Sequence, residues 1–238
     1  MNIALVGYGK MGRAIEEAAL EKGHKIILKI DADNQQDFTK ANLNKADVAI
    51  EFTHPESAYD NIIKCLQFGI PVVSGTTGWL QQLEEVKKFC RKLNATFLYA
   101  SNFSVGVNIF FEINKRLAEL MEKQQDYDIS LEEIHHTQKK DAPSGTAITL
   151  AEQILERIQR KKDWVNQVSG DPANLQIISK RIDPAPGTHI IKYVSPIDEI
   201  KIVHTAHSRK GFAAGAVLAA EFIAGKKGVF TMNDVLGL

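Results

Sequence analysis

The chain begins with Met1-Asn2-Ile3-Ala4-Leu5-Val6-Gly7-Tyr8-Gly9-Lys10-Met11-Gly12, a short apolar strand followed by a Gly-x-Gly-x-x-Gly loop. Gly7 permits a tight turn, Gly9 lets the backbone approach a pyrophosphate, and Gly12 lets the next helix pack closely on the strand. The N-terminus of that helix would offer unpaired N–H groups to phosphate oxygens. The stretch therefore predicts the first β-α unit of a dinucleotide-binding fold.

The context of the loop strengthens this interpretation, because such a loop alone also occurs as a structural turn. A second strand is expected at 25–30, and Asp31 follows it, 19 positions beyond the last glycine of the loop. An acid there accepts hydrogen bonds from the adenosine ribose and repels a 2′-phosphate. The next residue is Ala32 and not an arginine, so we expect NADH or NADPH as cofactor, with NADH preferred. The alternative is that Asp31 only forms a turn.

Apolar strands alternate with amphipathic helices through the first hundred residues. Further strands are expected at 47–52, 72–73 and 96–100, and helices at 11–21, 55–66 and 80–93. This alternation predicts a parallel sheet covered by helices on both faces.

The pattern changes after residue 104. A helix is expected at 107–122, a strand at 127–134, a helix from about Ser144, a loop at 160–170, and strands at 175–182, 189–194 and 199–206. An alanine-rich helix at 212–224 should pack back on the first domain. We therefore expect an α/β protein with a Rossmann-type dinucleotide-binding domain, formed by 1–104 and 212–238, and an α+β domain at 105–211 with a mixed, largely antiparallel sheet.

The composition narrows the class of protein. The 238 residues are 44% apolar, and Lys+Arg and Asp+Glu both number 29, which gives no basic surface for a nucleic-acid partner. Cys65 and Cys90 lie in apolar helical patterns and are expected to fill the core. The start of the chain lacks a signal-peptide pattern, and no apolar run approaches the ~20 residues of a membrane span. We expect a cytoplasmic protein without a membrane partner.

The stretch Glu132–Ala147 concentrates reactive side chains in the second domain. His135 and His136 can reach one ligand together only if their strand ends there, because adjacent strand residues face opposite ways. Ser144-Gly145-Thr146 marks a helix start, where backbone N–H groups and hydroxyls form an anion site. With Lys139 near by, the segment predicts a pocket for a small anionic substrate that is protonated during the reaction.

Simpler interpretations of this segment stay open. The histidine pair can lack a function, and either lysine can be a solvated loop residue, which is the interpretation we favour for Lys140. A metal site is not expected, since neither a His-Glu-x-x-His helix nor a Cys/His spacing accompanies the histidines.

Several motifs, taken in order, closely resemble the 4-hydroxy-tetrahydrodipicolinate reductase family, long called dihydrodipicolinate reductases, over nearly the whole chain. The motifs are Gly7–Gly12, Phe52–Pro55, Gly75–Gly78, Ser101–Asn108, Glu133–Lys139, Asp141–Ala147 and Arg209–Ala216. The chain departs from the family pattern in three places. It has His54 where the family often has an arginine, and its glycine loop is one residue shorter than in some members. The spacing within Arg181–His189 also differs from the usual one.

The resemblance implies roles for individual residues. His135 takes the family's general acid/base position and Lys139 its partner proton donor, and His136, Gly145 and Thr146 take the substrate-carboxylate positions. The implied cofactor-binding residues are Gly7, Tyr8, Gly9, Lys10, Met11, Gly12, Asp31, Gly75, Thr76, Thr77, Ala100, Ser101, Asn102 and Phe103. The implied reaction is hydride transfer to ring C4 of an unsaturated cyclic imine, followed by protonation at C3, in lysine and diaminopimelate biosynthesis. Family members are typically homotetramers joined through the sheet of the second domain.

Two other functions remain as alternatives: a two-domain NAD(P)-dependent dehydrogenase of another small acid, and an NADH-sensing regulator. The regulator would lack a proton-donor pocket and would gain from a basic DNA-binding helix, and the sequence meets neither condition.

Overall fold

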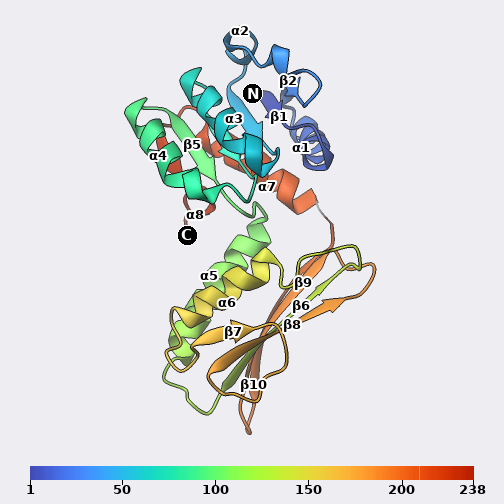
Figure 1. The fold of residues 1–238 in the computed structure, drawn as a ribbon, viewed down its shortest axis with the longest axis vertical. Coiled ribbons are helices and arrows are strands. Elements are labelled where there is room, and N and C mark those ends of the chain that lie inside the picture. The colour runs from blue at the N-terminus through green and yellow to red at the C-terminus, as the bar shows by residue number, and fades with distance from the viewer. Residues whose placement is uncertain (209) are drawn as a thin grey trace. The chain divides into compact units, whose positions relative to one another are not determined.

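The computed structural model describes residues 1–208 and 210–238, and it divides into two compact units (Figure 1). Unit 1 is Met1–Val105 with Lys210–Leu238, and unit 2 is Gly106–Arg209. Arg209, which opens one of the family motifs, lies outside the described residues.

Unit 1 contains a six-stranded sheet in the order β11-β5-β4-β3-β1-β2, and all its pairings are parallel. Its strands are β1 (Asn2–Val6), β2 (Lys25–Ile30), β3 (Val48–Glu51), β4 (Val72–Ser74), β5 (Thr96–Tyr99) and β11 (Gly228–Phe230). Its helices are α1 (Lys10–Glu21), η1 (Gln35–Asp37), α2 (Lys40–Leu43), α3 (Pro55–Gln67), η2 (Leu80–Gln82), α4 (Leu83–Lys92), α7 (Lys210–Ile223) and α8 (Met232–Leu236). The predicted Rossmann-type sheet is confirmed.

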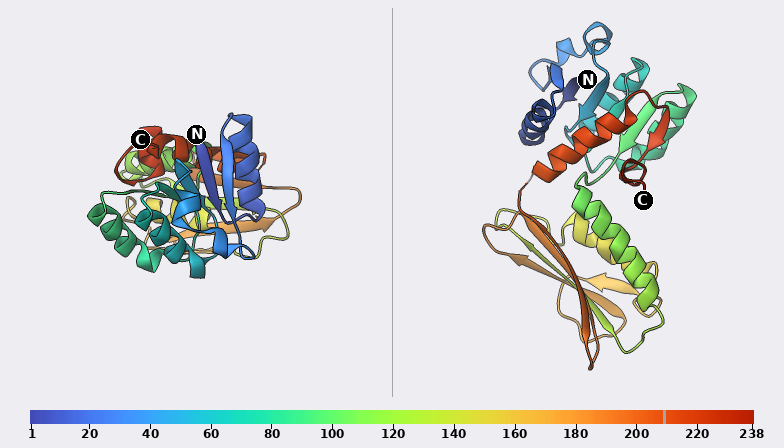
Figure 2. Two further views of the ribbon diagram at one scale, coloured as in Figure 1. Left: turned by 90° about the horizontal axis from the view of Figure 1, so that it is seen from above. Right: turned by 180° about the vertical axis from the view of Figure 1, so that it is seen from behind.

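Helices cover both faces of this sheet (Figure 2). On one face, α3 and α4 pack through Ala58, Ile62 and Val86 against the strands. On the other, α1 and the alanine-rich α7 pack against Ile3 and Leu5. Cys65 and Cys90 are both buried free cysteines of the first core, which confirms their predicted packing role. The strand order reverses beside β1, and ligands of such sheets bind at the carboxyl ends of the strands next to this point.

Some elements of unit 1 differ from the sequence expectation. The helix expected at 80–93 begins as the 3₁₀ turn η2 and becomes α-helical only at Leu83. The expectation also lacked the strand β11 and the helix α8, because three and five residues are too few to show a periodic pattern.

Unit 2 packs two helices on one face of a five-stranded sheet in the order β10-β9-β6-β8-β7. Its elements are α5 (Val105–Met121), β6 (Asp128–His135), α6 (Gly145–Leu155), β7 (Asp163–Val165), β8 (Asn174–Arg181), β9 (Gly187–Val194) and β10 (Glu199–Ala206). The core between the helices and the sheet includes Phe110, Leu131, Leu150, Ile177 and Tyr193.

The sheet of unit 2 is mixed, as expected, but less antiparallel than expected. β9 is antiparallel to β6 and β10, whereas β8 is parallel to both β6 and β7. β6 separates β8 from β9, although these two follow each other in the chain. The three-residue β7 lies in the stretch expected to be a loop. None of the described helices is long and apolar enough to cross a membrane.

Candidate active site

The glycine loop has the geometry that its sequence predicts. Gly7 has a φ of +95°, and a Cβ there would lie 2.0 Å from the carbonyl oxygen of Phe52. A Cβ on Gly12 would lie 2.3 Å from the carbonyl oxygen of Gly7, so the close packing of α1 on the loop requires glycine at both positions. Gly9 is the N-cap of α1 and provides no side-chain cap, which leaves the first N–H groups of the helix available to a ligand.

A cavity of about 680 Å³ lies over this loop in unit 1. It is lined by Gly7, Tyr8, Gly9, Lys10, Met11, Ile30, Asp31, Ala32, Gln35, Phe52, Thr53, His54, Ser57, Asn61, Gly75 and Thr76. The cavity thus brings together most of the predicted cofactor-binding residues. Its place at the carboxyl ends of β1, β3 and β4 is where sheets of this kind bind nucleotides.

Asp31 lines this cavity and also forms a turn. One carboxylate oxygen accepts a hydrogen bond from the N–H of Ala32 at 2.9 Å, and the Asp31 N–H donates to the Asn34 side chain at 2.7 Å. The two interpretations of Asp31 are therefore compatible: the turn fixes the backbone while the carboxylate borders the cavity.

The remaining predicted cofactor-binding residues do not line this cavity in the described part of the chain. Gly12 lies beneath the loop, Thr77 is exposed, and Ala100–Phe103 follow β5, the strand beyond β4. Phe103 is buried in the core, with its ring 5.6 Å from that of Phe52. This segment supports the cavity wall through Phe52.

Glu51, at the end of β3, is a fully buried carboxyl that is absent from the residues expected from the sequence. It accepts hydrogen bonds from the Ser74 and Thr76 hydroxyls at 2.6 and 2.7 Å and from the Thr53 N–H at 2.9 Å. Burial raises the pKa of Glu51 and outweighs these hydrogen bonds, which act to lower it. Glu51 joins the 51–53 turn to the 74–76 turn, and both turns border the cavity. In the sequence, the signal for this buried carboxyl is the acidic residue that directly precedes the Phe52–Pro55 motif.

In unit 2, β6 ends at His135, one residue beyond the expected strand, so His136 is the first residue after it. His135 is buried, on the same face of the strand as Glu133, and its Nδ1 lies 3.4 Å from Glu133 Oε2. Burial lowers the pKa of His135, Lys139 and Arg181 lower it further, and the nearby Glu133 carboxylate opposes this by raising it.

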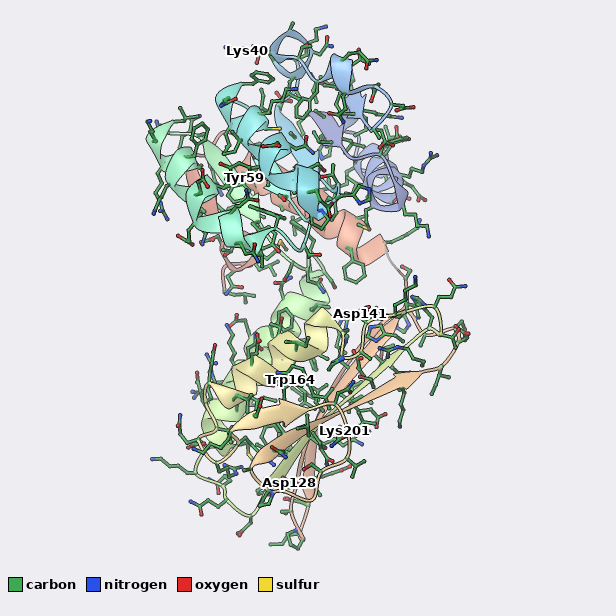
Figure 3. The ribbon with its side chains drawn as sticks, in the orientation of Figure 1. Lys40, Tyr59, Asp128, Asp141, Trp164 and Lys201 are labelled. Atoms are coloured by element: carbon green, nitrogen blue, oxygen red, sulfur yellow. The ribbon has the colours of Figure 1, made fainter. Side chains whose placement is uncertain are left out.

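Lys139 and Asp141 lie on the loop between β6 and α6, where Figure 3 labels Asp141. The Lys139 ammonium donates to both oxygens of Asp141 at 2.8 Å, and its charge acts on His135. The two predicted proton-transfer residues are thus close enough for the Lys139 charge to lower the pKa of His135. Lys140 is exposed.

The predicted helix start at Ser144 is confirmed, because the Ser144 hydroxyl caps α6 by accepting from the Ala147 N–H at 3.2 Å. Gly145 and Thr146 form the first turn of the helix, and Gly145 is exposed. The Ser144 N–H donates to the Glu133 carboxylate, so the predicted anion site is connected to the strand that carries His135.

His136 borders a cavity at the end of β6. It lines a cavity of about 310 Å³ with Gln138, Asp183, Pro184, Ala185, Pro186 and Ser208, and neither Gly145 nor Thr146 is among these described lining residues. The joint role of the three residues as carboxylate-binding groups stays a prediction.

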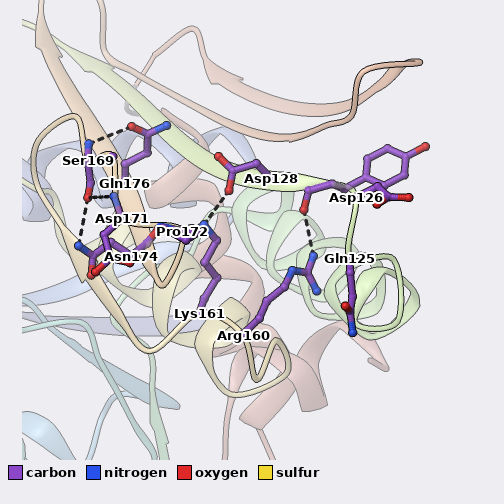
Figure 4. A pocket seen from close by; sticks show the side chains of 12 residues that line it. Gln125, Asp126, Asp128, Arg160, Lys161, Ser169, Asp171, Pro172, Asn174 and Gln176 are labelled. Carbon is purple, nitrogen blue, oxygen red and sulfur yellow. Dashed lines mark hydrogen bonds and ion pairs between the residues drawn. The ribbon is translucent and has the colours of Figure 1, made fainter.

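A third cavity, of about 290 Å³, lies at the other end of the unit 2 sheet (Figure 4). The Lys161 ammonium donates to Asp128 at 2.7 Å, and the Arg160 guanidinium donates to backbone carbonyls that include Glu122 and Tyr127. The Lys161 and Arg160 side chains are thus held by groups of the protein itself. Their presence in the lining is explained by the structure and does not require a ligand.

Comparisons with known proteins match the chain in both parts. The family model described as dihydrodipicolinate reductase, N-terminus, matches residues 1–103, and the one described as dihydrodipicolinate reductase, C-terminus, matches residues 106–236. The 4-hydroxy-tetrahydrodipicolinate reductase of Christiangramia forsetii is 51% identical over 99% of this chain and 98% of that protein. The enzyme of the same name from Alkaliphilus oremlandii is 32% identical over 100% of this chain and 99% of that protein.

The fold also matches a solved structure. Dipicolinate-bound dihydrodipicolinate reductase from Paenisporosarcina sp. TG-14 has a TM-score of 0.77 and 22% sequence identity, with 97% of each chain covered. This likeness supports the same two-part architecture.

Proposed function

Since the chain belongs to the dihydrodipicolinate reductase family, we propose that it reduces 4-hydroxy-tetrahydrodipicolinate to tetrahydrodipicolinate with NADH or NADPH, in lysine and diaminopimelate biosynthesis. The structural observation that carries the proposal is the grouping of His135, Lys139 and the start of α6 in unit 2. It supplies a proton-transfer residue, an ammonium group and an anion-binding helix end.

The residues of unit 1 fit a dinucleotide. Gly7–Gly12 and the uncapped N-terminus of α1 would hold the pyrophosphate, and Asp31 would accept hydrogen bonds from the ribose. When bound, the nicotinamide supplies the hydride. The carboxylate of Asp31 disfavours a 2′-phosphate, which supports a preference for NADH.

The residues of unit 2 hold the substrate and move protons. His136 and the N–H and hydroxyl groups of Gly145 and Thr146 bind its carboxylates, and the Lys139 ammonium adds positive charge. Loss of water across ring C3 and C4 of the substrate would leave a conjugated imine, which would accept the hydride at C4 and become an enamine. The His135 imidazolium then donates its proton to C3 of the resulting enamine, with Lys139 as the partner donor.

The unit 2 sheet supports a homotetramer as the assembled form. α5 and α6 cover one face, while Val194 and Val203 are 42% and 50% exposed on β9 and β10. β10 is an edge strand and β9 is its neighbour, and exposed apolar side chains at and beside the edge of a sheet favour association with a second copy. The assembly would be cytoplasmic, as the sequence suggests.

A coupled assay tests the proposed function. Substrate is generated from pyruvate and aspartate semialdehyde, and the loss of NADH or NADPH absorbance is followed. We expect turnover with a higher kcat/KM for NADH than for NADPH. Absence of turnover with both cofactors would reject the assignment, and turnover with equal or better use of NADPH would reject only the role given to Asp31.

A further inference from the structure

The core-facing side of β6 changes from apolar to charged at the end of the strand. Ile129 and Leu131 are buried in the core, and the next two residues on that face are Glu133 and His135. Glu133 has no exposed surface. A buried carboxylate is costly without charged or hydrogen-bonding partners, so its contacts reveal what it holds in place.

Glu133 connects the strand to the start of α6. Both carboxylate oxygens lie 3.1 Å from the Ser144 N–H, which donates to them. The negative charge thus sits at the positive end of the helix whose first residues are Gly145 and Thr146. Burial alone would raise the pKa of Glu133, but these Ser144 hydrogen bonds and the charge of His135 help to hold that pKa below its usual value.

Arg181, at the end of β8, connects Glu133 to the loop that carries Lys139. Its Nη2 donates to Glu133 Oε1 at 3.2 Å and to the Asp141 carbonyl at 2.6 Å, and its Nε donates to the Lys139 carbonyl at 3.3 Å. One planar guanidinium therefore bridges the carboxylate and two points of the loop, a geometry that a lysine cannot reproduce.

The His135 ring is confined beside this pair. A Cβ on Gly187 would lie 3.0 Å from His135 Nε2, so the ring occupies space that only glycine leaves free. On its other side, Nδ1 is buried without a hydrogen-bond partner among the described residues, and Glu133 Oε2 is 3.4 Å away. Glu133 is thus the acceptor that Nδ1 can use when the ring carries its second proton.

We propose that Glu133 and Arg181 form a positioning pair for the reductase reaction, which fixes His135, the Lys139 loop and the start of α6 relative to one another. The proposal rests on the function proposed above. Neither residue contacts the reacting atoms; each acts through the groups that it holds.

A metal site is the competing explanation for the same cluster, since ligand atoms of Glu133, His135 and His189 lie within 4.8 Å of one another. Two features favour the positioning pair. The guanidinium of Arg181 already pairs with the carboxylate, and its charge opposes a cation. His189 is held by the Ser144 hydroxyl, 3.2 Å from its Nε2, and so belongs to the same hydrogen-bonded group.

Three variants separate a positioning role from general stability. Glu133→Gln keeps the shape of the side chain but removes its charge, and Arg181→Lys keeps the charge but removes the bridge. Glu132→Gln is the matched control, because Glu132 lies on the opposite face of the same strand and pairs with Lys180. We expect kcat to fall about 10-fold or more in the first two and to stay near wild type in the control, with NADH affinity unchanged in all three.

A double variant tests whether Glu133 acts through His135. If it does, adding Glu133→Gln to His135→Gln should lower kcat little beyond the loss caused by His135→Gln alone. Two losses that multiply would show that Glu133 does not act through His135, and that result would overturn the part of the proposal in which the pair positions this ring.

NMR titration of the His135 ring gives a readout that needs no turnover. The charged groups around the ring are Glu133 on its own strand, Lys139 and Asp141 on the loop, Arg181 on β8 and His189 on β9. Because Glu133 raises the pKa of His135, Glu133→Gln should lower that pKa, whereas Glu132→Gln should leave it unchanged.

The outcomes are distinguishable. Normal kcat and an unchanged His135 titration in Glu133→Gln would overturn the positioning pair while leaving the proposed function intact. Wild-type protein without turnover would reject the function, and a shifted titration would still support the Glu133–His135 interaction. If Glu133→Gln does not fold, Arg181→Lys, at a partly exposed residue, decides the question through kcat and the same titration. Loss of wild-type activity on chelation, restored by a divalent cation, would favour the metal site.

Discussion

At the scale of single residues, the burial of His135 determines how it can serve as an acid. A histidine with a lowered pKa is mostly neutral at pH 7, but its protonated form is a stronger proton donor than an exposed imidazolium. Because the proposed role needs the protonated form, kcat should fall as pH rises through the pKa of His135. The fall in kcat should be centred at a pH below 6.5, because 6.5 is the ordinary pKa of histidine and the pKa of His135 is lowered.

Substitutions at the two proton-transfer positions test this assignment. We expect His135→Gln and Lys139→Ala each to lower kcat by about 100-fold or more, since each removes a proton-transfer group, while NADH binding survives. Lys139 also lowers the pKa of His135, so the pH limb of the residual activity in Lys139→Ala should move to higher pH. Steady-state kinetics from pH 5 to 9 with a fluorescence titration of NADH would measure both effects. Near-native kcat in both variants would mean that other groups transfer the proton.

At the scale of elements, Glu51 is the point that joins two strand ends beneath the unit 1 cavity. Replacing it with leucine would leave the hydroxyls of Ser74, Thr76 and Thr53 without the carboxyl group to which they donate. We therefore expect Glu51→Leu to lose several kcal/mol of stability, at about 1–3 kcal/mol per unpaired group. Glu51→Gln keeps an acceptor of the same shape and should stay much closer to wild type. Chemical unfolding at pH 7 measures the difference.

The pH dependence of that comparison has a defined sign. Glu51 has a pKa raised above 4.5 in the folded state, so protonation favours folding, and this stabilisation is lost as pH rises from 4.5 through the folded value. The free energy of unfolding of wild type minus that of Glu51→Gln should therefore decrease from acidic toward neutral pH and then level off. A difference that stays constant between pH 4 and 7 would show that Glu51 titrates normally.

The strands, helices and turns of this protein differ in how well they can be predicted from their own residues. The Gly7–Gly12 loop and the strand ending at His135 follow from the chain alone, because a tight turn needs glycine and an alternating strand needs period two. The position of β6 between β8 and β9, and the partners of Glu133 and Glu51, could not be read from it. Arg181 lies 48 positions from Glu133 in sequence, and only strand pairing brings them to 3.2 Å.

At the scale of the whole molecule, the unit 2 sheet has an exposed edge that the proposed tetramer would use. β10 is an edge strand, and Val203 on it is 50% exposed opposite Ile190 of β9. Burial of the exposed half of the Val203 side chain in an interface contributes roughly 1 kcal/mol per copy. An aspartate there would instead bring an unpaired charge into the contact.

Val203→Asp should therefore shift the protein from tetramer toward smaller species in size-exclusion chromatography with light scattering. Val168→Asp is the matched control, because Val168 is 79% exposed in the loop after β7, at the other edge of the sheet. The secondary structure should persist in both variants, since neither side chain belongs to the core between the sheet and α5 and α6. An unchanged mass for Val203→Asp, or a wild-type protein that runs as a monomer, would remove this edge as the assembly surface. Loss of the tetramer in both variants would point to a general effect of added charge.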